Sequence, residues 1–458
     1  MKDEGTGLQV YKFGGASVKD AAAILNLCRI VQDYGPSGPL LIVVSAMGKT
    51  TNALEEIYNL AYHGRDYQKA LQKLEDFHSA TALELLGEPE ADEDGETFHP
   101  LQQWFTELRQ ALTAVRPTGD YDQQYDQVVS HGELLASQLV FECLYRQNEL
   151  PAGINNWRWH DARRSIHTND TWREGQVDWL ATQVRLDHYY QNNEHASFAN
   201  YITVTQGFIG GAPDVLVRNA YLESVGAMNW QHRTTTLGRE GSDYSAAIFA
   251  YCLGAESVTI WKDVPGLLNA DPKIFPDTVL YPEISYQETI EMAFYGASVI
   301  HPKTLKPLAD RHIPLRVRSF LDPSAPGTLI HDCQHPPLVP AFIRKGGQCL
   351  LSFESKDFAF ISEENLEVIF GALAQARLKI NLMQNSAISF SVCTDFNEMR
   401  VQRLLGLLQG QFRVQYNSDL TLFTIKHYDA ASIRQLTGGR ELLLEQRTRS
   451  TFQFLVRE

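Results

Sequence analysis

The sequence predicts an α/β fold with a mainly parallel sheet, followed by a smaller α+β region. In the first part, short apolar runs alternate with stretches of helical spacing, as in parallel strands joined by helices. After about residue 335, the pattern changes to strand–helix–strand–strand and the glycine-rich turns end. We therefore expect two domains, 1–334 and 335–458, joined by a linker at His335-Pro336-Pro337.

The expected elements of the first domain follow from hydrophobic periodicity. The run at 40–44 (LLIVV) is continuously apolar, as in a central parallel strand, and the acidic stretch 87–100 is typical of a solvated loop. Strands are predicted at 8–13, 40–44, 201–205 and 257–261, and helices at 18–33, 52–86, 126–147 and 243–254.

The C-terminal region is expected to hold two small α+β modules. The first has a strand (CLLSFES), a helix (ENLEVIFGALAQAR) and two strands (KINLMQNS, AISFSVCTD). The second has a helix at 397–408, strands at 412–418 and 420–428, a helix at 429–436 and two closing strands. Such an addition is typical of a regulatory region.

Composition and charge restrict the class of partner. The 458 residues are 44% hydrophobic and 21% charged, as in ordinary globular proteins. The formal net charge of −15 argues against nucleic acid or an anionic membrane as the main partner. Phosphate sites are built locally, so an anionic ligand such as ATP is compatible with this charge. No run approaches the ~20 apolar residues of a membrane span, and the N-terminus has no apolar signal core.

The six cysteines are scattered, with no CxxC pair. Their spacing predicts neither a disulfide framework nor a zinc site, and most lie in apolar contexts as small core residues. A reducing cytoplasm fits this pattern best.

Glycine-rich and polar turns follow several predicted strands. In Lys12-Phe13-Gly14-Gly15-Ala16-Ser17, the glycines let the backbone approach a phosphate, and the next helix offers free N–H groups. Lys12 adds a positive charge. A tight turn with an exposed lysine explains this motif equally well. It is neither a Walker loop nor GxGxxG.

Three further segments place polar groups where an α/β sheet binds ligands. In 234–245 (TTTLGREGSDYS), Ser242 or Asp243 caps a helix and Arg239 offers a bidentate fork for an anion. A capped helix with a surface arginine is the alternative. The turn at 45–52 (SAMGKTTN) suits ligand binding, but taken alone it favours an ordinary Ser/Thr-rich turn. The turn at 261–267 (WKDVPGL), followed by Asp271-Pro272-Lys273, suits nucleotide binding or a plain turn alike.

Seven motifs together resemble the aspartate kinase family, in order and at similar spacings, from about residue 9 to 330. The C-terminal pattern resembles the paired ACT domains of that family. The motifs are KFGGASV, VVSAMGKTTNAL, SHGELLAS, TQGFIG, TTTLGREGSDYSAA, IWKDVPGLLNADPK and EMAFYGASVIHPKTLKPL.

The resemblance implies a three-layer αβα amino-acid-kinase (carbamate-kinase-like) fold with a mainly parallel sheet, then α+β ACT (ferredoxin-like) domains. It implies transfer of the γ-phosphoryl group of ATP, with Mg²⁺ carried by the nucleotide, to the side-chain carboxylate of L-aspartate. That reaction begins lysine, threonine and methionine synthesis.

The resemblance also assigns roles by position. Lys12 and Asp243 match catalytic positions, and no residue is expected to bind a metal directly. The implied aspartate-side residues are Ser45, Thr51, Glu133, Arg239 and Ser242. The implied ATP-side residues are Lys12, Gly14, Gly15, Ser17, Lys262, Asp263 and Lys273. His131 and His301 are expected to be structural.

The chemistry is consistent with this set. A carboxylate nucleophile with a reference pKa of about 3.9 is already ionised and needs no general base. The task is to bring two anions together, which repel by roughly 4 kcal/mol at 4 Å in an effective dielectric of 20. Lys12, Arg239, Mg²⁺ and N–H dipoles are expected to offset that repulsion.

Several positions depart from the family pattern. Ala16 replaces a threonine, Glu240 a glycine, Ser298 a lysine and Leu268 a frequent tyrosine, which affects how ATP is held. The segment 211–233 is longer than usual. Near the first ACT helix, Glu363 and Glu364 suit the helix dipole or the ammonium of an effector.

Other functions remain open at this point. One is a sister kinase for glutamate, acetylglutamate or UMP, and another is a catalytically silent ACT-type amino-acid sensor. The resemblance implies a lysine or threonine effector and a homodimer or larger homo-oligomer formed through the ACT domains. The sequence fixes neither the effector nor the oligomer geometry.

Overall fold

The computed structural model describes residues 7–88, 100–152, 154, 156–191, 201–213, 232–297, 300–334, 338–356 and 360–457. Some features discussed above therefore lie outside the described residues. They are the linker 335–337, most of the acidic loop 87–100, most of the segment 211–233, and Ser298.

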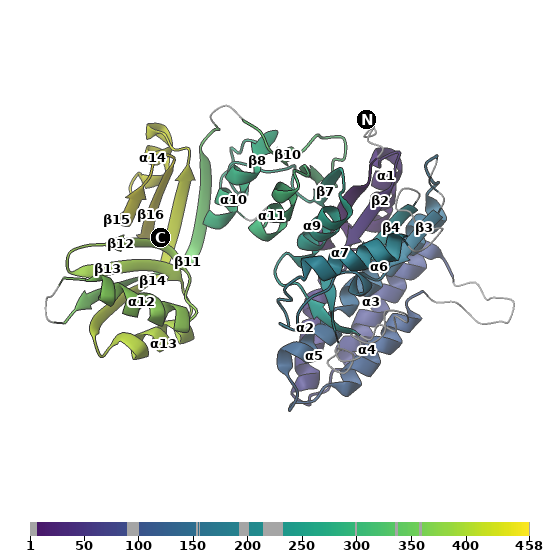
Figure 1. The fold of residues 1–458 in the computed structure, drawn as a ribbon, viewed down its shortest axis with the longest axis horizontal. Coiled ribbons are helices and arrows are strands. Elements are labelled where there is room, and N and C mark those ends of the chain that lie inside the picture. Colours follow the sequence, from purple (N-terminus) through teal and green to yellow (C-terminus); the bar gives the residue numbers. More distant parts are fainter. Residues whose placement is uncertain are drawn as a thin grey trace. The chain divides into compact units, whose positions relative to one another are not determined.

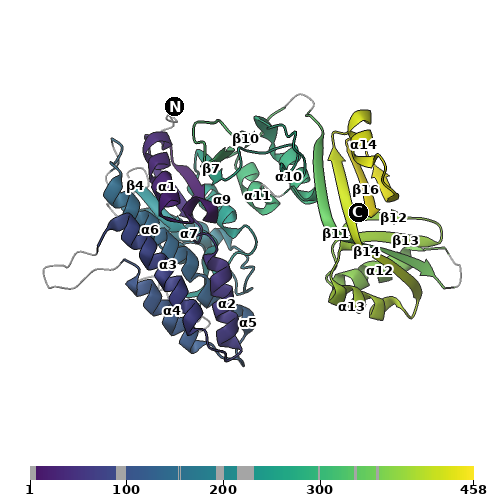
Figure 2. The same ribbon diagram turned by 180° about the vertical axis from the view of Figure 1, so that it is seen from behind.

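The chain forms two compact units, which Figures 1 and 2 show from opposite sides. The first comprises residues 1–267, 280–289 and 300–334, and the second comprises 268–279, 290–299 and 335–458. The second unit thus includes two short segments from the range 1–334. We keep 1–334 and 335–458 as a proposal for the domain organisation.

The first unit is built on an eight-stranded, mainly parallel sheet. The strand order is β3-β4-β2-β1-β7-β9-β10-β8. From β3 to β9 all neighbours are parallel, whereas β10 runs antiparallel to β9 and β8 is parallel to β10. The bounds are β1 Gln9–Phe13, β2 Leu40–Val44, β3 Asn156–His160, β4 Tyr201–Gln206, β7 Ser257–Lys262, β8 Glu283–Ser285, β9 Leu315–Ser319 and β10 Thr328–His331; β5 (Ile209–Pro213) and β6 (His232–Thr236) form a separate two-stranded antiparallel sheet.

Helices cover both faces of this sheet. Consecutive residues of a strand point to opposite faces. On β3, Trp159 donates to Ser137 of one helix (α6), while the His160 ring packs against Phe249 of another (α9). The expected three-layer αβα arrangement is therefore present. The helices of this unit are α1 Ala21–Tyr34, α2 Thr50–Tyr62, α3 Gln68–Leu86, α4 Gln102–Ala114, α5 Tyr121–Val129, α6 His131–Gln147, α7 Trp179–Gln191, α9 Gly241–Leu253 and α11 Pro302–Asp310, while α10 (Tyr286–Tyr295) crosses the division between the units.

The central strands form where apolar runs predict them. Every residue of β1 and β2 is buried, which a strand covered by helices on both faces requires. Two long predicted helices are each divided in two. The stretch 52–86 is interrupted between Tyr62 and Gln68, where Gly64 has a left-handed φ of 66°, and the stretch 126–147 divides at Ser130. None of the helices in the described part of the chain is both long and apolar enough to cross a membrane.

The second unit contains one six-stranded antiparallel sheet of order β12-β13-β11-β14-β16-β15. Two strands of 15 residues each, β11 and β14, pair along almost their whole length at its centre. The bounds are β11 Ala341–Ser355, α12 Glu363–Gln375, β12 Ile380–Asn385, β13 Ser389–Asp395, α13 Glu398–Leu408, β14 Phe412–Lys426, α14 Ala430–Thr437, β15 Leu442–Arg447 and β16 Thr451–Arg457.

The two predicted modules are therefore joined more closely than the sequence indicated. The predicted strands 412–418 and 420–428 are one strand, β14, whose ends belong to different hydrophobic cores. Helix α13, expected in the second module, packs with α12 in the first core through Leu404 and Ile369. Its apolar face packs into the core formed with β11 and with the first residues of β14, Phe412 and Val414.

The core of α12 and α13 gives a test of stability with a control on the same helix. Leu404 is fully buried, whereas Leu407 is 45% exposed. Leu404→Ala should lower the free energy of unfolding of the second unit by about 2–5 kcal/mol, because it leaves a cavity. Leu407→Ala should change it by less than about 1 kcal/mol. Urea denaturation followed by circular dichroism measures both, and equal losses would refute this packing.

Candidate active site

The carboxyl ends of two adjacent strands carry the central charges. Lys12 lies on β1 and Lys262 ends β7, and these strands pair side by side. Asp243, in the first turn of α9, lies between the two ammonium groups. Its Oδ1 is 2.6 Å from Lys12 Nζ, in an ion pair that lacks the geometry of a directed hydrogen bond, and its Oδ2 is 3.0 Å from Lys262 Nζ. The predicted pair Lys12 and Asp243 is thus in direct contact.

Asp243 remains ionised in this setting. Burial by itself raises the pKa of Asp243. The positive charges of Lys12 and Lys262 lower it by more than burial raises it, so the net pKa is below the ordinary value. Lys12 and Asp243 are both buried, with 8% and 3% of their side chains exposed. A buried charge of this kind is stable only when it is paired, so each member constrains the position of the others.

The glycine-rich turn after β1 lies against the loop after β2. Gly15 begins a 3₁₀ turn, Gly15–Val18, and its carbonyl accepts the N–H of Gly48 at 3.0 Å. A Cβ at Gly15 would lie 2.9 Å from the carbonyl oxygen of Ala46, so only glycine allows this approach. Ser17 is buried and its hydroxyl donates to the carbonyl of Trp261 at 3.4 Å, which links the turn to β7.

The side chains of this turn leave its outer surface open. A Cβ at Gly14 would lie 3.4 Å from Lys12 Nζ, so glycine at this position leaves space beside the ammonium. Ala16 is exposed, and the hydroxyl that it lacks relative to the family pattern would have faced outward. The turn therefore presents mainly backbone beside a buried lysine.

The loop after β2 contacts Glu133 of α6. The Glu133 Oε1 atom accepts the N–H of Ala46 at 3.2 Å. Ser45 and Thr51, the predicted substrate-side residues, are half-buried on either side of this contact in sequence. The close packing extends to Gly132, where a Cβ would lie 2.9 Å from that of Ala46.

Glu133 is a buried carboxyl group that is only partly satisfied. Its Oε2 atom is buried and has no hydrogen-bond partner among the described residues. Burial raises the pKa of Glu133 to about 8, although the Ala46 N–H and the charge of Lys12 act in the opposite direction. A cationic group placed beside Oε2 would restore the ionised form.

The turn between β6 and α9 holds Arg239, Glu240 and Ser242. Arg239 is exposed and forms no ion pair with any residue that the structure describes. Ser242 is buried in the first turn of α9, where a Cβ added at Gly207 would collide with it. Ser242 directly precedes Asp243 and Arg239 lies four residues before it, but only Arg239 is open to solvent.

Glu240 has a backbone conformation that glycine, the residue of the family pattern at this position, adopts easily. Its φ of 54° is left-handed, at the residue before α9, and its side chain makes no capping hydrogen bond. Such a conformation costs about 1–2 kcal/mol for a residue with a Cβ. Its Oε2 atom is buried without a hydrogen-bond partner in the described part of the chain. The replacement of the family's glycine by Glu240 therefore adds an unsatisfied carboxylate oxygen to this turn.

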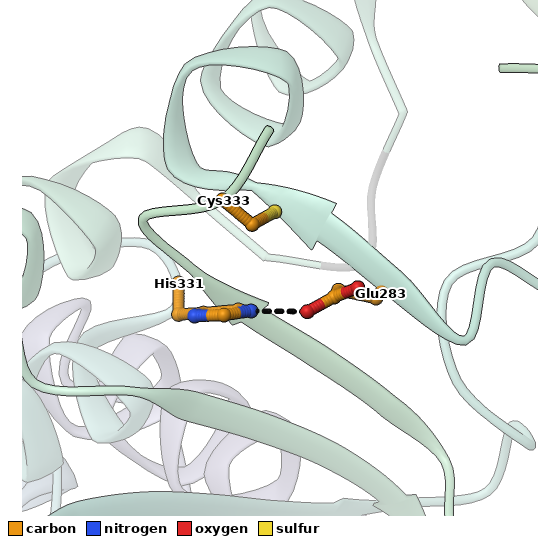
Figure 3. Close-up of side chains that lie close together, drawn as sticks. All are labelled: Glu283, His331 and Cys333. Atoms are coloured by element: carbon orange, nitrogen blue, oxygen red, sulfur yellow. Dashed lines mark hydrogen bonds and ion pairs between the residues drawn. The ribbon is translucent and has the colours of Figure 1, made fainter. Parts of the chain in front are cut away.

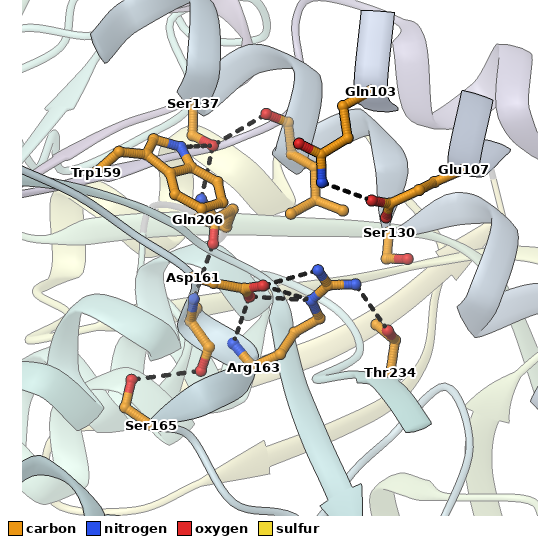
Figure 4. Close-up of polar contacts among 12 residues, drawn as sticks. Gln103, Glu107, Ser130, Ser137, Trp159, Asp161, Arg163, Ser165, Gln206 and Thr234 are labelled. Carbon is orange, nitrogen blue, oxygen red and sulfur yellow. Dashed lines mark hydrogen bonds and ion pairs between the residues drawn. The ribbon is translucent and has the colours of Figure 1, made fainter. Parts of the chain in front are cut away.

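A polar network behind β6 fixes the strand that leads to this turn (Figure 4). The guanidinium of Arg163 holds both carboxylate oxygens of Asp161, at 2.7 and 2.9 Å, and donates to the Thr234 hydroxyl at 3.3 Å. Gln206, from the TQGFIG motif, accepts the N–H of Ala162 at 2.8 Å and donates to Ser137 at 2.7 Å. This network was not predicted from the sequence, in which the position of Gln206 within TQGFIG is its one signal.

Asp126 of α5 anchors the other side of the same strand. It accepts the backbone N–H and the hydroxyl of Thr236, at 3.0 and 2.8 Å, and the N–H of Arg173 at 2.9 Å. Burial raises its pKa to about 6, while these hydrogen bonds oppose that shift. Lys303 of α11 also supports the turn by donating to the carbonyl of Leu237 at 2.8 Å. Neither residue was singled out from the sequence.

The two motif histidines have structural contacts. Burial lowers the pKa of His131 to about 4, so its ring is neutral, and its Nδ1 atom lies 3.2 Å from the carbonyl of Val128. His301 caps α11, where its Nδ1 accepts the N–H of Lys303 at 3.1 Å. These contacts agree with the structural roles expected for both rings.

Some of the predicted nucleotide-binding residues do not contact the cluster of Lys12, Asp243 and Lys262. Asp263 is exposed at the turn after Lys262. Lys273 and Leu268 belong to the second unit, where the Lys273 N–H is donated to the Asp271 carboxylate at 2.9 Å. Ser298 is outside the described residues, so the roles of these positions stay predictions.

Comparison with known proteins places the chain in a family. The model of the amino acid kinase family matches residues 7–319. Lysine-sensitive aspartokinase 3 of Escherichia coli (strain K12) is 33% identical over 91% of this chain and 86% of its own length. A bifunctional aspartokinase/homoserine dehydrogenase of Daucus carota is 31% identical over 88% of this chain, which spans only 42% of that relative.

Solved structures agree with these relatives. E. coli aspartokinase III in complex with aspartate and ADP has a TM-score of 0.76 and 28% identity, with coverage of 98% of this chain and 96% of that one. The same enzyme in complex with lysine and aspartate has a TM-score of 0.73 at the same identity and coverage. The antiparallel second unit is thus the regulatory ACT architecture that the sequence resembled. The chain belongs to the amino acid kinase family and, within it, to the aspartokinases.

Proposed function

We propose that this chain is an aspartate kinase that converts L-aspartate and ATP to 4-phospho-L-aspartate and ADP. The observation that carries the proposal is the buried carboxylate of Asp243 between Lys12 and Lys262 at the carboxyl edge of a parallel sheet. This is where open α/β sheets bind ligands. The E. coli relative that binds aspartate and ADP matches the chain over nearly its full length.

The reaction requires charge stabilisation more than proton transfer. A side-chain oxygen of aspartate attacks the γ-phosphorus, and the bond from that phosphorus to the bridging oxygen of ADP breaks. The electron pair leaves with ADP, and no proton is removed from the ionised nucleophile. Lys12 is held by Asp243 and stabilises the negative charge on the transferring group.

The aspartate end of the site supplies two complementary groups. The unsatisfied Oε2 of Glu133 suits the ammonium group of the substrate, and the exposed guanidinium of Arg239 suits its α-carboxylate. Ser45, Thr51 and Ser242 are proposed to complete this pocket. These roles follow from the family resemblance and from the geometry of Glu133.

The nucleotide end fits ATP with Mg²⁺. The glycine turn presents backbone beside Lys12, and Gly15 has no space for a Cβ. We assign the phosphates to Gly14, Gly15, Ser17, Lys12 and Lys262, and assign contacts farther along the nucleotide to Asp263 and Lys273. When bound with ATP, Mg²⁺ would neutralise phosphate charge.

A direct assay separates this function from its alternatives. Release of ADP, with hydroxamate formation when hydroxylamine is present, should require L-aspartate. Turnover of glutamate, acetylglutamate or UMP in its place would establish a sister kinase. Amino-acid binding without any turnover would establish a silent sensor, which the intact charge cluster argues against.

The regulatory assignments rest on the ACT architecture. We propose feedback by lysine or threonine, assembly as a homodimer or larger homo-oligomer through the second unit, and a cytoplasmic location. The six cysteines are all free. Glu363 and Glu364 begin α12 behind a capping box formed by Ser362 and Asn365, so the helix dipole accounts for them without an effector.

Replacement of Lys12 should lower kcat. Lys12→Ala removes the cation held beside the transferring group, and we expect kcat to fall by about 10²- to 10³-fold, as for loss of one preorganised charge-stabilising group. Coupled ADP release at saturating aspartate measures this.

Lys69→Ala, an exposed lysine on α3, is the control and should leave kcat unchanged. A folded Lys12→Ala protein with unaltered kcat would exclude this lysine from phosphoryl transfer.

Glu133 should give the Michaelis constant a pH dependence. Its folded-state pKa of about 8 is raised above the ordinary carboxyl value of 4.5, so the free protein holds a neutral Glu133 at pH 7. Because the substrate ammonium pairs with the carboxylate, binding releases a proton. The KM for aspartate should therefore fall by about tenfold per unit as pH rises toward 8 and then level off.

Glu133→Gln should raise the KM at pH 8 and abolish this slope. Glu142→Gln, on the same helix and half-buried, should retain the wild-type profile. Initial rates at several pH values, with Lys12 intact, measure both. A wild-type KM that does not change with pH would contradict the ammonium-binding role.

A further inference from the structure

A second cluster of reactive side chains lies on the outer strands of the same sheet (Figure 3). Glu283, His331 and Cys333 each direct one ligand atom into the cluster, and these atoms all lie within 4.8 Å of one another. His331 Nε2 is hydrogen-bonded to Glu283 Oε1 at 2.6 Å. None of the three takes part in the charge cluster around Asp243.

Strand geometry explains why the three side chains converge. β10 and β8 are parallel neighbours, with His331 opposite Ser285 and Leu329 opposite Glu283. Ile284 and Ile330 are fully buried on one face, so the alternate residues Glu283 and His331 share the other face. Cys333 follows His331 by two positions and returns to the same side.

The intervening residue is turned elsewhere. Asp332 forms an ion pair with His312, which lies outside the cluster. The alternation from His331 to Cys333 therefore continues past the end of the strand. It brings one carboxylate, one imidazole and one thiol to a single point.

We propose that Glu283, His331 and Cys333 form a binding site for a transition-metal divalent cation of the zinc class. A thiolate and an imidazole together favour Zn²⁺ over Mg²⁺ or Ca²⁺, which prefer oxygen ligands. Three protein ligands with water in the fourth position give the tetrahedral coordination that Zn²⁺ adopts.

The cluster needs only a small adjustment to accept the ion. Bond lengths of about 2.0–2.3 Å place the ligand atoms of a tetrahedral Zn²⁺ site about 3.3–3.8 Å apart. The Glu283–His331 contact must lengthen from 2.6 Å, and the Cys333 sulfur must approach. The side chains of Glu283 and His331 are 50% and 30% exposed, so they have room to move and an entry path from solvent. Binding releases the thiol proton of Cys333.

The proposed metal site lies at the opposite edge of the sheet from the kinase charges. Lys262 ends β7 beside Ser319, at the carboxyl end of β9. Because β10 runs antiparallel to β9, its residue Ile330 pairs with Leu315 at the amino end of β9, and His331 follows. Metal binding here is therefore separate from phosphoryl transfer, and its test does not depend on catalysis.

The site also explains why cysteine spacing gave no indication of it. Paired cysteines are the usual sequence signal of a zinc site, whereas only one ligand here is a cysteine. Glu283 is 48 residues from His331 and becomes its neighbour only through the pairing of β8 with β10. Cys333 is the one cysteine of the six that is not buried.

Metal titration of the full chain tests the proposal. Chelator-stripped protein should bind one equivalent of Zn²⁺, measured by competition with a chromophoric chelator, and excess Mg²⁺ should not displace it. Co²⁺ in place of Zn²⁺ should give a thiolate-to-metal charge-transfer absorption. Cys333→Ser should abolish that absorption and weaken Zn²⁺ binding at least tenfold.

Glu283→Gln, at an exposed position, provides a second variant if Cys333→Ser does not fold, and should also weaken Zn²⁺ binding at least tenfold. His63→Gln, at the exposed histidine that follows the end of α2, is the control and should bind Zn²⁺ as the wild type does. All variants should keep the wild-type kcat. Absence of the cobalt–thiolate absorption in the wild type, or equal Zn²⁺ affinity in the wild type and both ligand variants, would overturn the proposal.

Discussion

The contact of one buried carboxylate with two lysines organises the first unit. Asp243 lies in the first turn of α9, Lys12 on β1 and Lys262 on β7, so the ion pairs join one helix to two adjacent strands. A buried carboxylate without these partners would be strongly destabilising, since breaking a buried pair costs about 3–5 kcal/mol. The geometry of the turn before α9 and the direction of Lys12 both depend on that requirement.

Glu133 and Glu240 each have a carboxylate oxygen without a hydrogen-bond partner among the described residues, for different structural reasons. Glu133 lies at the start of α6, in the HGE motif, and its Oε1 accepts the N–H of Ala46. Its Oε2 has no partner among the described residues, so the carboxylate can accept one cationic group. Glu240 instead occupies a strained backbone position where the family pattern has glycine. Strain of this kind persists only where surrounding structure fixes it. Here the hydrogen bonds of β6 and the packing of Gly241 against Phe208 fix the turn.

The parts of the fold that could be predicted from the sequence are those that local patterns encode. The fully apolar strands β1 and β2 and the glycine turn each carry their signal within a few residues. The predicted cap of α9 was wrong: the helix begins at Gly241, so Ser242 and Asp243 lie inside its first turn, and Glu240 precedes it without a capping hydrogen bond. The meeting of Lys12 with Lys262 at Asp243 depends on β7 lying beside β1. These two strands are far apart in the sequence, so no local pattern encodes that they are neighbours. The same limit hid the Arg163 network and the Glu283 cluster. The division of 52–86 into two helices was missed because Gly64 is tolerated within a helical pattern at modest cost.

The shared strands β11 and β14 have a consequence for how the second unit must assemble. One end of the pair faces the core of α12 and α13, and the other end contributes to the core beneath α14. The ladder has register shifts near Gln348, between these two regions, and a slip of one residue along its whole length would turn the side chains of both regions to the wrong face. An alignment error of that kind is therefore penalised in two cores at once.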